Sequence, residues 1–285
     1  MGDLLIKEKP KIQLEHFLKF WQTLKPMEIE KARHIINQEL YSAPNIGTQY
    51  DNYLQKIQSR WYSSLKSNDP DYSIYNDDYY LAESWFCWVR CSRNYVNSLN
   101  RKNGLSKDIT VYQYLKGINS VLDLDAGIGY STAALKQLFK SCDVSAFEIY
   151  GTTQYEFCKI MGAQYGFKVI SDIDKLPNVD LIFASEYFEH FERPIEHLIN
   201  IIENSNPKYF YIANSFRRSG RGHFNKYKHL NTVYDKNVIS KVFNDRLKYF
   251  GYEKQNTNLW QNRPNFWEKK TNKKLEKDKG LCRFI

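Results

Sequence analysis

The chain has 285 residues and a mass of 33.9 kDa, of which 42% of residues are hydrophobic and 26% are charged. A chain of this length can bury a full core, and it contains no run of 18 apolar residues that would predict a transmembrane helix. The net charge of +9 is uneven: residues 211–285 hold 18 basic and 6 acidic residues, whereas residues 111–210 hold 8 and 13.

The basic C-terminal quarter favours an anionic partner, with nucleic acid or a nucleotide as the leading candidate. The alternative is a solvated surface that only aids solubility. The N-terminus lacks the apolar stretch of a secretory signal, and the cysteines form no Cys-x-x-Cys pair, so we expect a cytoplasmic protein with free thiols and no membrane partner. The five cysteines are Cys87, Cys91, Cys142, Cys158 and Cys282.

Residues 1–108 are expected to form a helical region that ends in a linker around residues 101–110. The stretch from Tyr72 to Tyr95 is dense in aromatic residues. These side chains either form a core against the rest of the protein or stack on a substrate base as a cap. Apolar residues recur at helical spacing in four segments, 16–24, 28–40, 50–65 and 79–99.

Residues 109–268 are expected to form an α/β domain. The apolar run 121–124 leads into a loop with Gly127 and Gly129, and a helical pattern follows. Glycines there let the backbone pass close to a ligand. Glu148 ends the next strand-like run, 19 residues after Gly129. An acid at that spacing can accept both hydrogen bonds of a ribose diol.

In this order, the residues resemble the class I S-adenosylmethionine-dependent methyltransferases, whose loop is usually Asp/Glu-x-Gly-x-Gly-x-Gly. The resemblance covers residues 115–260, about half the chain. It implies an α/β fold with a seven-stranded, mostly parallel Rossmann-like sheet and helices on both faces. It also implies S-adenosylmethionine as cofactor, with Asp172 at the adenine amino group. The implied cofactor-binding residues are Asp123, Asp125, Gly127, Gly129, Glu148, Asp172 and Glu186.

Asp125 departs from that family pattern, because the loop usually has its first glycine there. In the family this position lies beside the methionyl part of the cofactor, and two carboxylates about 4 Å apart repel by about 1 kcal/mol in water. Three interpretations are open. Asp125 turns to a ribose hydroxyl or to the ammonium group, the chain binds the cofactor weakly or not at all, or the ligand lacks the methionyl carboxylate.

A second group of polar residues follows the fourth expected strand. Glu186, Glu189 and His190 would share one face of a helix, and two carboxylates with an imidazole can bind a divalent cation. The segment is similar to the Glu-x-x-Glu-His segment of ubiquinone-biosynthesis O-methyltransferases and of small-RNA 2′-O-methyltransferases. That resemblance implies a fourth metal ligand, His223, with His229 as second choice. The alternatives are a metal-free pocket, with Glu189, His190 and His223 as catalytic candidates, and a purely structural role.

The same segment lacks the Asp/Asn-Pro-Pro-Tyr of DNA amino-methyltransferases and the Pro-Cys of cytosine C5 enzymes, so neither chemistry is expected. After the strand at 209–213, a basic loop carries Arg217, Arg218 and Arg221, which we expect to bind substrate phosphates. A helix at 238–249 and a hairpin around 256–267 complete the domain.

The sequence therefore predicts methyl transfer from S-adenosylmethionine to an oxygen or nitrogen of a nucleic acid or nucleotide. One alternative is a small-metabolite O-methyltransferase. The other is a catalytically inactive methyltransferase fold that binds nucleic acid or a protein partner. Residues 269–285 are expected to be a basic tail.

Overall fold

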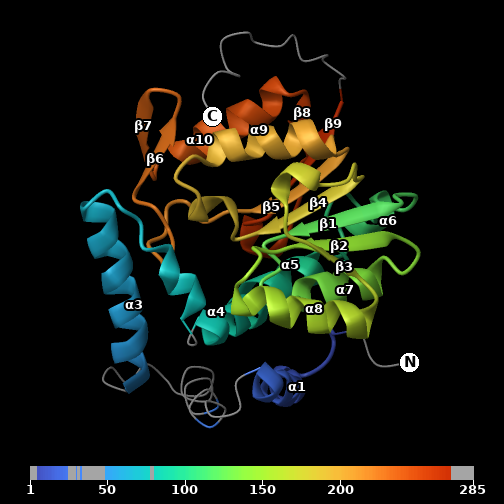
Figure 1. Cartoon of the computed structure of the whole chain (residues 1–285). Coiled ribbons are helices and arrows are strands. Elements are labelled where there is room, and N and C mark those ends of the chain that lie inside the picture. The colour runs from blue at the N-terminus through green and yellow to red at the C-terminus, as the bar shows by residue number, and fades with distance from the viewer. Residues whose placement is uncertain (1–4, 25–29, 31–32, 34–48, 78–79, 271–285) are drawn as a thin grey trace.

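The computed structural model describes residues 5–24, 30, 33, 49–77 and 80–270 (Figure 1). Nearly all of the helix expected at 28–40 and of the tail expected at 269–285 lies outside these ranges.

A seven-stranded sheet organises the fold, in the order β3-β2-β1-β4-β5-β9-β8. The five strands from β3 to β5 pair in parallel, and β9 pairs antiparallel with β5 and β8. Buried strands with almost no polar residue are typical of parallel sheets covered on both faces. The predicted fold class is confirmed. The strands are β1 (Ser120–Leu124), β2 (Asp143–Phe147), β3 (Lys168–Ile170), β4 (Leu181–Ser185), β5 (Tyr209–Ala213), β8 (Tyr252–Lys254) and β9 (Asn265–Lys269).

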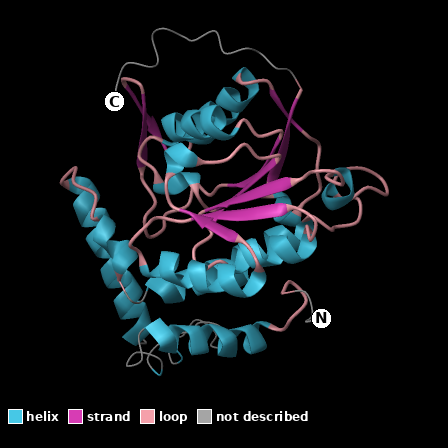
Figure 2. Ribbon diagram, turned by 45° about the vertical axis from the view of Figure 1, so that its right-hand side comes forward, coloured by secondary structure: helices cyan, strands magenta, loops and turns pink. Residues whose placement is uncertain are grey.

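Helices cover both faces of this sheet (Figures 1 and 2). One layer holds α5 (Arg93–Ser98), α7 (Tyr130–Leu138) and α8 (Thr153–Tyr165), and the other holds α9 (Pro194–Ser205) and α10 (Ile239–Tyr249). The short helix α6 (Val111–Tyr114) begins with a capping box in which Thr110 and Gln113 satisfy each other's backbone N–H groups.

The helix expected at 79–99 is divided. It runs as α4 (Tyr80–Cys87), a π-helical turn η2 (Trp88–Ser92) and then α5. Single π-turns inside helices are frequent at functional sites. Before it come α1 (Pro10–Leu24), α3 (Gln49–Lys66) and the 3₁₀ turn η1 (Tyr72–Asn76).

Many of the described aromatic residues of the helical region form part of one hydrophobic core with the sheet domain. Phe17 of α1 stacks on Trp85 of α4 with ring centroids 4.9 Å apart, and it also contacts Phe157 of α8 at 5.2 Å. Trp85 in turn meets Tyr130 of α7 edge-on at 5.4 Å. Aromatic pairs at these distances add about 0.5–1.5 kcal/mol each beyond the burial of their area.

Two further strands, β6 (Lys226–His229) and β7 (Thr232–Asp235), form a separate hairpin that the sequence pattern did not predict. The last helix and the final hairpin of β8 and β9 are confirmed. The four described cysteines are free thiols. None of the helices in the described ranges is long and apolar enough to cross a membrane.

Candidate active site

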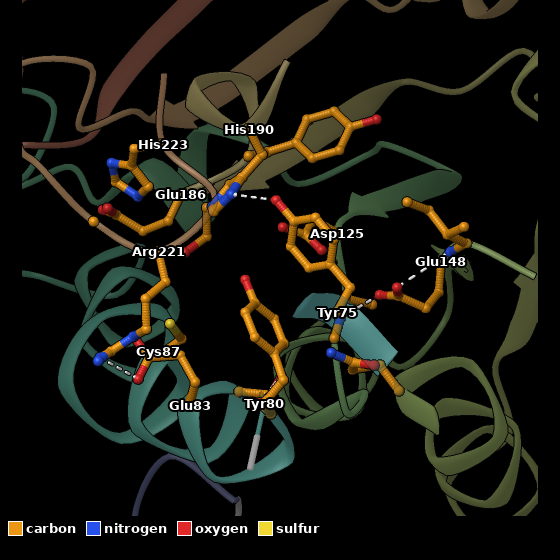
Figure 3. Close-up of a pocket in the computed structure, with 18 of the residues that line it drawn as sticks. Tyr75, Tyr80, Glu83, Cys87, Asp125, Glu148, Glu186, His190, Arg221 and His223 are labelled. Carbon is orange, nitrogen blue, oxygen red and sulfur yellow. Dashed lines mark hydrogen bonds and ion pairs between the residues drawn. The ribbon is translucent and has the colours of Figure 1, made fainter. Parts of the chain in front are cut away.

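A cavity of about 1230 Å³ opens at the carboxyl ends of the central parallel strands (Figure 3). Ligands of open α/β sheets bind at this edge. It is lined by the loops after β1, β2 and β4, by the loop between β5 and β6, and by the segment from η1 to η2. Residues of α3 and α9 also contribute to the lining.

The loop after β1 turns through left-handed backbone conformations. Asp125, Gly127 and Gly129 have φ angles of 58°, 54° and 79°. A side chain at Gly129 would place its Cβ 3.0 Å from the Cβ of Met161, so this position needs glycine. Asp125 adopts the conformation that the usual glycine would adopt, which aspartate tolerates better than most residues. Its side chain lines the cavity.

Glu148 is fixed over this loop by two backbone hydrogen bonds. Its Oε2 accepts from the N–H of Gly127 at 2.7 Å, and its Oε1 accepts from the N–H of Ile149 at 3.1 Å. The side chain is buried but still lines the cavity. Each carboxylate oxygen has a second lone pair, so Glu148 can accept further hydrogen bonds from a ligand.

Asp125 and Glu148 make one end of the cavity acidic, and we call this part of the cavity the acidic end. Burial, then the charge of Asp125, raises the pKa of Glu148 well above its usual range. The cavity walls desolvate Asp125, and with Asp123 nearby they raise its pKa to about 7, although its side chain is exposed to the cavity. No lysine, arginine or histidine of the described ranges forms an ion pair with either acid, so a cationic ligand would be favoured here.

Three residues expected to touch the cofactor, Asp123, Gly129 and Asp172, do not line the cavity. Gly129 is packed against Met161 of α8 instead. The Oδ2 of Asp123 accepts from the hydroxyls of Ser131 and Thr132 at 2.6 and 2.7 Å, so Asp123 supports the start of α7. Asp172 caps the 3₁₀ turn η3 (Ile173–Lys175), and its carboxylate pairs with Lys175 at 2.8 Å. The expectation that Asp172 binds the adenine ring is therefore not supported by its position.

The segment after β4 is not the helix that was expected. Only Phe188–His190 is helical, as the 3₁₀ turn η4, and Glu186 precedes it with a φ of 55°. Glu186 lines the cavity and accepts from the hydroxyl of Tyr95 at 2.7 Å, and its carboxylate also contacts the hydroxyl of Ser215.

Glu189 points away from the cavity. Its side chain is fully buried, and its Oε1 accepts from the N–H and the hydroxyl of Ser215, both at 2.8 Å. Burial, then Glu186, raises the pKa of Glu189 well above its usual range. The shared helix face assumed for Glu186 and Glu189 is therefore wrong, because the chain turns between them.

His190 and His223 meet at the cavity with their ring centroids 4.9 Å apart. The Nδ1 of His190 lies 3.1 Å from the hydroxyl of Tyr75. Burial lowers the pKa of His190 to about 3 and that of His223 to about 4, so both rings are neutral at pH 7. A neutral imidazole at this position can accept a proton.

The expected metal ligands Glu186, Glu189, His190 and His223 are not gathered around one point, because Glu189 turns to Ser215. Within the part of the chain that the structure describes, no group of three or more His, Cys, Asp or Glu residues is arranged to hold a metal ion. The Nδ1 of His223 lies 3.1 Å from the carbonyl oxygen of Arg218. His229 is buried between Glu196 and Arg246, where it fixes the β6–β7 hairpin.

The three arginines of the basic loop have different surroundings. Arg218 and Arg221 line the cavity, and Arg217 is exposed outside it. Arg221 forms an ion pair with Glu83 of α4 at 2.6 Å. Three arginines were expected to bind phosphate. Among the described residues, Arg218 is the one of the three that both lines the cavity and forms no ion pair.

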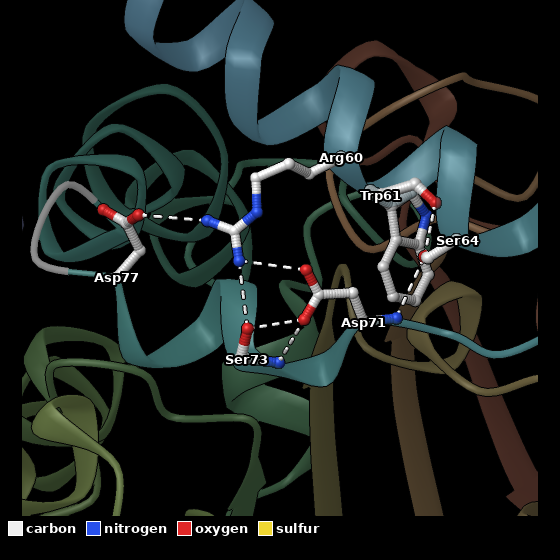
Figure 4. A network of polar contacts seen from close by, with 6 residues as sticks. All are labelled: Arg60, Trp61, Ser64, Asp71, Ser73 and Asp77. Atoms are coloured by element: carbon white, nitrogen blue, oxygen red, sulfur yellow. Dashed lines mark hydrogen bonds and ion pairs between the residues drawn. The ribbon is translucent and has the colours of Figure 1, made fainter.

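The sequence pattern did not single out Tyr72, Tyr75 and Tyr80 as site residues, although all three line the cavity. The signal was the density of aromatic residues, for which a cap over the substrate was one of two interpretations. Figure 4 shows how η1 is anchored: Arg60 of α3 donates to Asp71 at 2.9 Å and to Ser73 at 3.0 Å.

Solved structures share this fold at low sequence identity. An O-methyltransferase family protein from Burkholderia thailandensis is 13% identical, with a TM-score of 0.53 over 81% of this chain and 74% of that chain. PigF with SAH has a TM-score of 0.49 at 13% identity over 77% and 71% of the two chains. The plantazolicin methyltransferase BpumL has a TM-score of 0.40 at 17% identity over 58% of this chain, and the chain spans 62% of its length.

The first of these likenesses supports the fold, a Rossmann-like methyltransferase sheet. No protein-family model and no curated protein sequence matches the chain.

Proposed function

We propose that the protein is an S-adenosylmethionine-dependent methyltransferase that acts on an oxygen or nitrogen acceptor bound in the same cavity. The observation that carries this proposal is the placement of Glu148. Its carboxylate is held by the N–H groups of Gly127 and Ile149, at the end of β2 and above the turn that follows β1. It is fixed and buried and lines the cavity, and in dinucleotide-binding sheets an acid at the corresponding spacing accepts the hydrogen bonds of the ribose hydroxyls.

The size and charge of the cavity fit two ligands. Its volume of about 1230 Å³ exceeds the roughly 300–1,000 Å³ of a usual small-molecule site. The acidic end suits the positive charge of a sulfonium. When bound, S-adenosylmethionine supplies an electrophilic methyl group, and the C–S bond pair goes to sulfur as the acceptor forms its bond to carbon.

His190 is the residue that can take the proton which the acceptor loses. It lines the cavity and is neutral, whereas Glu189 does not reach the cavity. Its neighbour Tyr75 orients the ring through the contact at 3.1 Å. A pKa of about 3 makes His190 a weak base, so most of the rate would come from holding donor and acceptor in line.

Titration with S-adenosylhomocysteine in a calorimeter tests the proposal. We expect binding to wild type, and we expect Glu148→Ala to weaken it by about 1–3 kcal/mol because the ribose hydroxyls would be buried without their acceptor. Glu156→Ala, on the exposed side of α8, is the matched control and should bind as wild type does. Equal affinity of wild type and Glu148→Ala would refute the ribose assignment, and no binding at all would refute the proposed function.

A further inference from the structure

We propose that the acceptor is a nucleotide, free or within a nucleic acid, whose phosphate is bound by Arg218 and Lys236 and whose ring stacks on Tyr72. This deepens the proposed function, because it names the class of acceptor for the same cavity. It concerns binding, so it can be tested apart from methyl transfer.

The first support is the distribution of charge around the cavity. On the side of Arg221 and His223, away from Asp125 and Glu148, the cavity has a rim formed by the loop before β6, by α4 and by the segment after β4 (Figure 3). The β6–β7 hairpin follows that loop. Two acids at this rim are paired with cations: Glu83 of α4 with Arg221 at 2.6 Å, and Glu192 with Lys228 at 2.8 Å. Two others are hydrogen-bonded instead, Glu186 to the hydroxyls of Tyr95 and Ser215 and Asp235 to the N–H of Asn237. Paired charges largely cancel at a distance.

Two cations of the rim are different. Neither Arg218 nor Lys236 forms an ion pair with any acid in the described ranges; Arg218 is exposed, and Lys236 is half-buried. Arg218 lines the cavity. The Nζ of Lys236 donates to the hydroxyl of Ser219, another lining residue, at 3.0 Å, so its charge lies at the same rim. An arginine fork with a lysine beside it is a donor set suited to phosphate.

The second support is the exposed ring of Tyr72. It lines the cavity with 51% of its surface exposed, so its ring is accessible to a ligand. One neighbour, Tyr75, lies nearly parallel to it with centroids 6.5 Å apart, and another, Trp61, meets it edge-on at 6.0 Å. Every nucleobase has a flat face that stacks on such a platform.

These two features lie beside the residue that would take the proton. Tyr75, the neighbour of Tyr72, contacts His190 at 3.1 Å. Trp61, on the other side of Tyr72, donates its ring N–H to the carbonyl oxygen of His223 at 2.7 Å, which joins α3 to the basic loop. An acceptor that stacks on Tyr72 with its phosphate at the rim would therefore lie next to His190, and the opposite charges at the two ends would keep a cationic donor and an anionic acceptor apart.

The experiment measures binding of three matched probes, uridine, uridine 5′-monophosphate and a labelled hexauridylate RNA, at 50 mM salt, with and without S-adenosylhomocysteine. We expect the monophosphate to bind wild type at least about tenfold more tightly than uridine. The double variant with Arg218→Gln and Lys236→Gln should bind uridine and uridine 5′-monophosphate with equal affinity. Arg217→Gln removes the same charge from the neighbouring position outside the cavity, so this matched control should bind as wild type does.

Tyr72→Ala should weaken uridine and its monophosphate by the same factor, about tenfold, since stacking does not depend on the phosphate. Raising the salt concentration separates the two sources of phosphate. The logarithm of the binding constant is plotted against the logarithm of the salt concentration. A free nucleotide should give a slope of about one unit, for its one phosphate contact, whereas a single-stranded nucleic acid should give about 0.7 units for each of several contacts.

The proposal is overturned if the monophosphate binds no more tightly than uridine, or if Arg217→Gln weakens binding as much as Arg218→Gln does. Should the probes fail while S-adenosylhomocysteine binds, the nucleotide acceptor is refuted and a small uncharged acceptor takes its place. Should S-adenosylhomocysteine alone fail to bind, it is the methyltransferase proposal that is refuted, and the titrations without it still decide the phosphate site.

Discussion

Asp125 has a backbone conformation that glycine adopts more readily, and its carboxylate faces a cavity that contains a second acid. The sequence alone marked this residue as the departure from the loop pattern, because the order of acid, loop glycines and Glu148 could be read from spacing. The φ of 58° gives the physical reason why the pattern has glycine there. No spacing could show that Glu148 would be held by two backbone N–H groups.

The raised pKa of Asp125 predicts a pH-dependent stability. Desolvation, then Asp123, raises this pKa from 3.8 to about 7 in the folded chain. Its contribution to stability is therefore present below pH 3.8 and is lost as the pH rises to 7. Asparagine does not ionise, so the melting temperature of Asp125→Asn relative to wild type should increase from pH 5 to pH 8 without ligand. Asp143→Asn, at an exposed position of β2, is the control. A difference that stays constant with pH would show that Asp125 is ionised throughout.

At the scale of elements, the predictions that differ from the structure concern short segments. The Glu-x-x-Glu-His spacing predicted a helix face, but only the three residues of η4 are helical, so Glu189 turns to Ser215 while His190 turns to the cavity. Asp172 was expected at the ligand because it follows β3, but its side chain caps the next turn instead. Hydrophobic periodicity cannot distinguish such alternatives over three or four residues.

Gly222 packs against two side chains of the site, Tyr75 and His190, and its replacement tests how closely they approach it. Its φ is 78°, and a Cβ there would lie 2.3 Å from the hydroxyl oxygen of Tyr75 and 2.6 Å from the Nδ1 of His190. Gly166 has a φ of 77° with no atom within 4 Å of such a Cβ. Both Gly→Ala variants carry the strain of positive φ, about 1 kcal/mol, but only Gly222→Ala adds the clash.

Urea unfolding should therefore show a larger loss of stability for Gly222→Ala than for Gly166→Ala, by about 1–3 kcal/mol as for other overpacked sites. Equal losses in the two variants would mean that Tyr75 and His190 do not pack against Gly222.

At the scale of the whole molecule, the class of fold could be predicted because the loop glycines, Glu148 and the strands around them follow one another in the order of a known family. The relation between the helical region and the sheet could not, since it depends on contacts between residues far apart in the chain. Phe17 and Phe157 are 140 positions apart and lie in contact. The structure makes the helical region part of the site, because Tyr72, Tyr75 and Tyr80 form one wall of the cavity.

A shared core predicts that a change in the first helix destabilises the whole protein. Phe17 is fully buried among Trp21, Trp85 and Phe157. Phe17→Ala should therefore reduce the free energy of unfolding by about 3–5 kcal/mol. Ile12, on the same helix, is 48% exposed, and Ile12→Ala should change the stability by less than about 1 kcal/mol. Far-ultraviolet circular dichroism and tryptophan fluorescence should follow a single urea transition in both variants. Two separate transitions, or a small loss for Phe17→Ala, would show that the helical region folds on its own and only rests against the sheet.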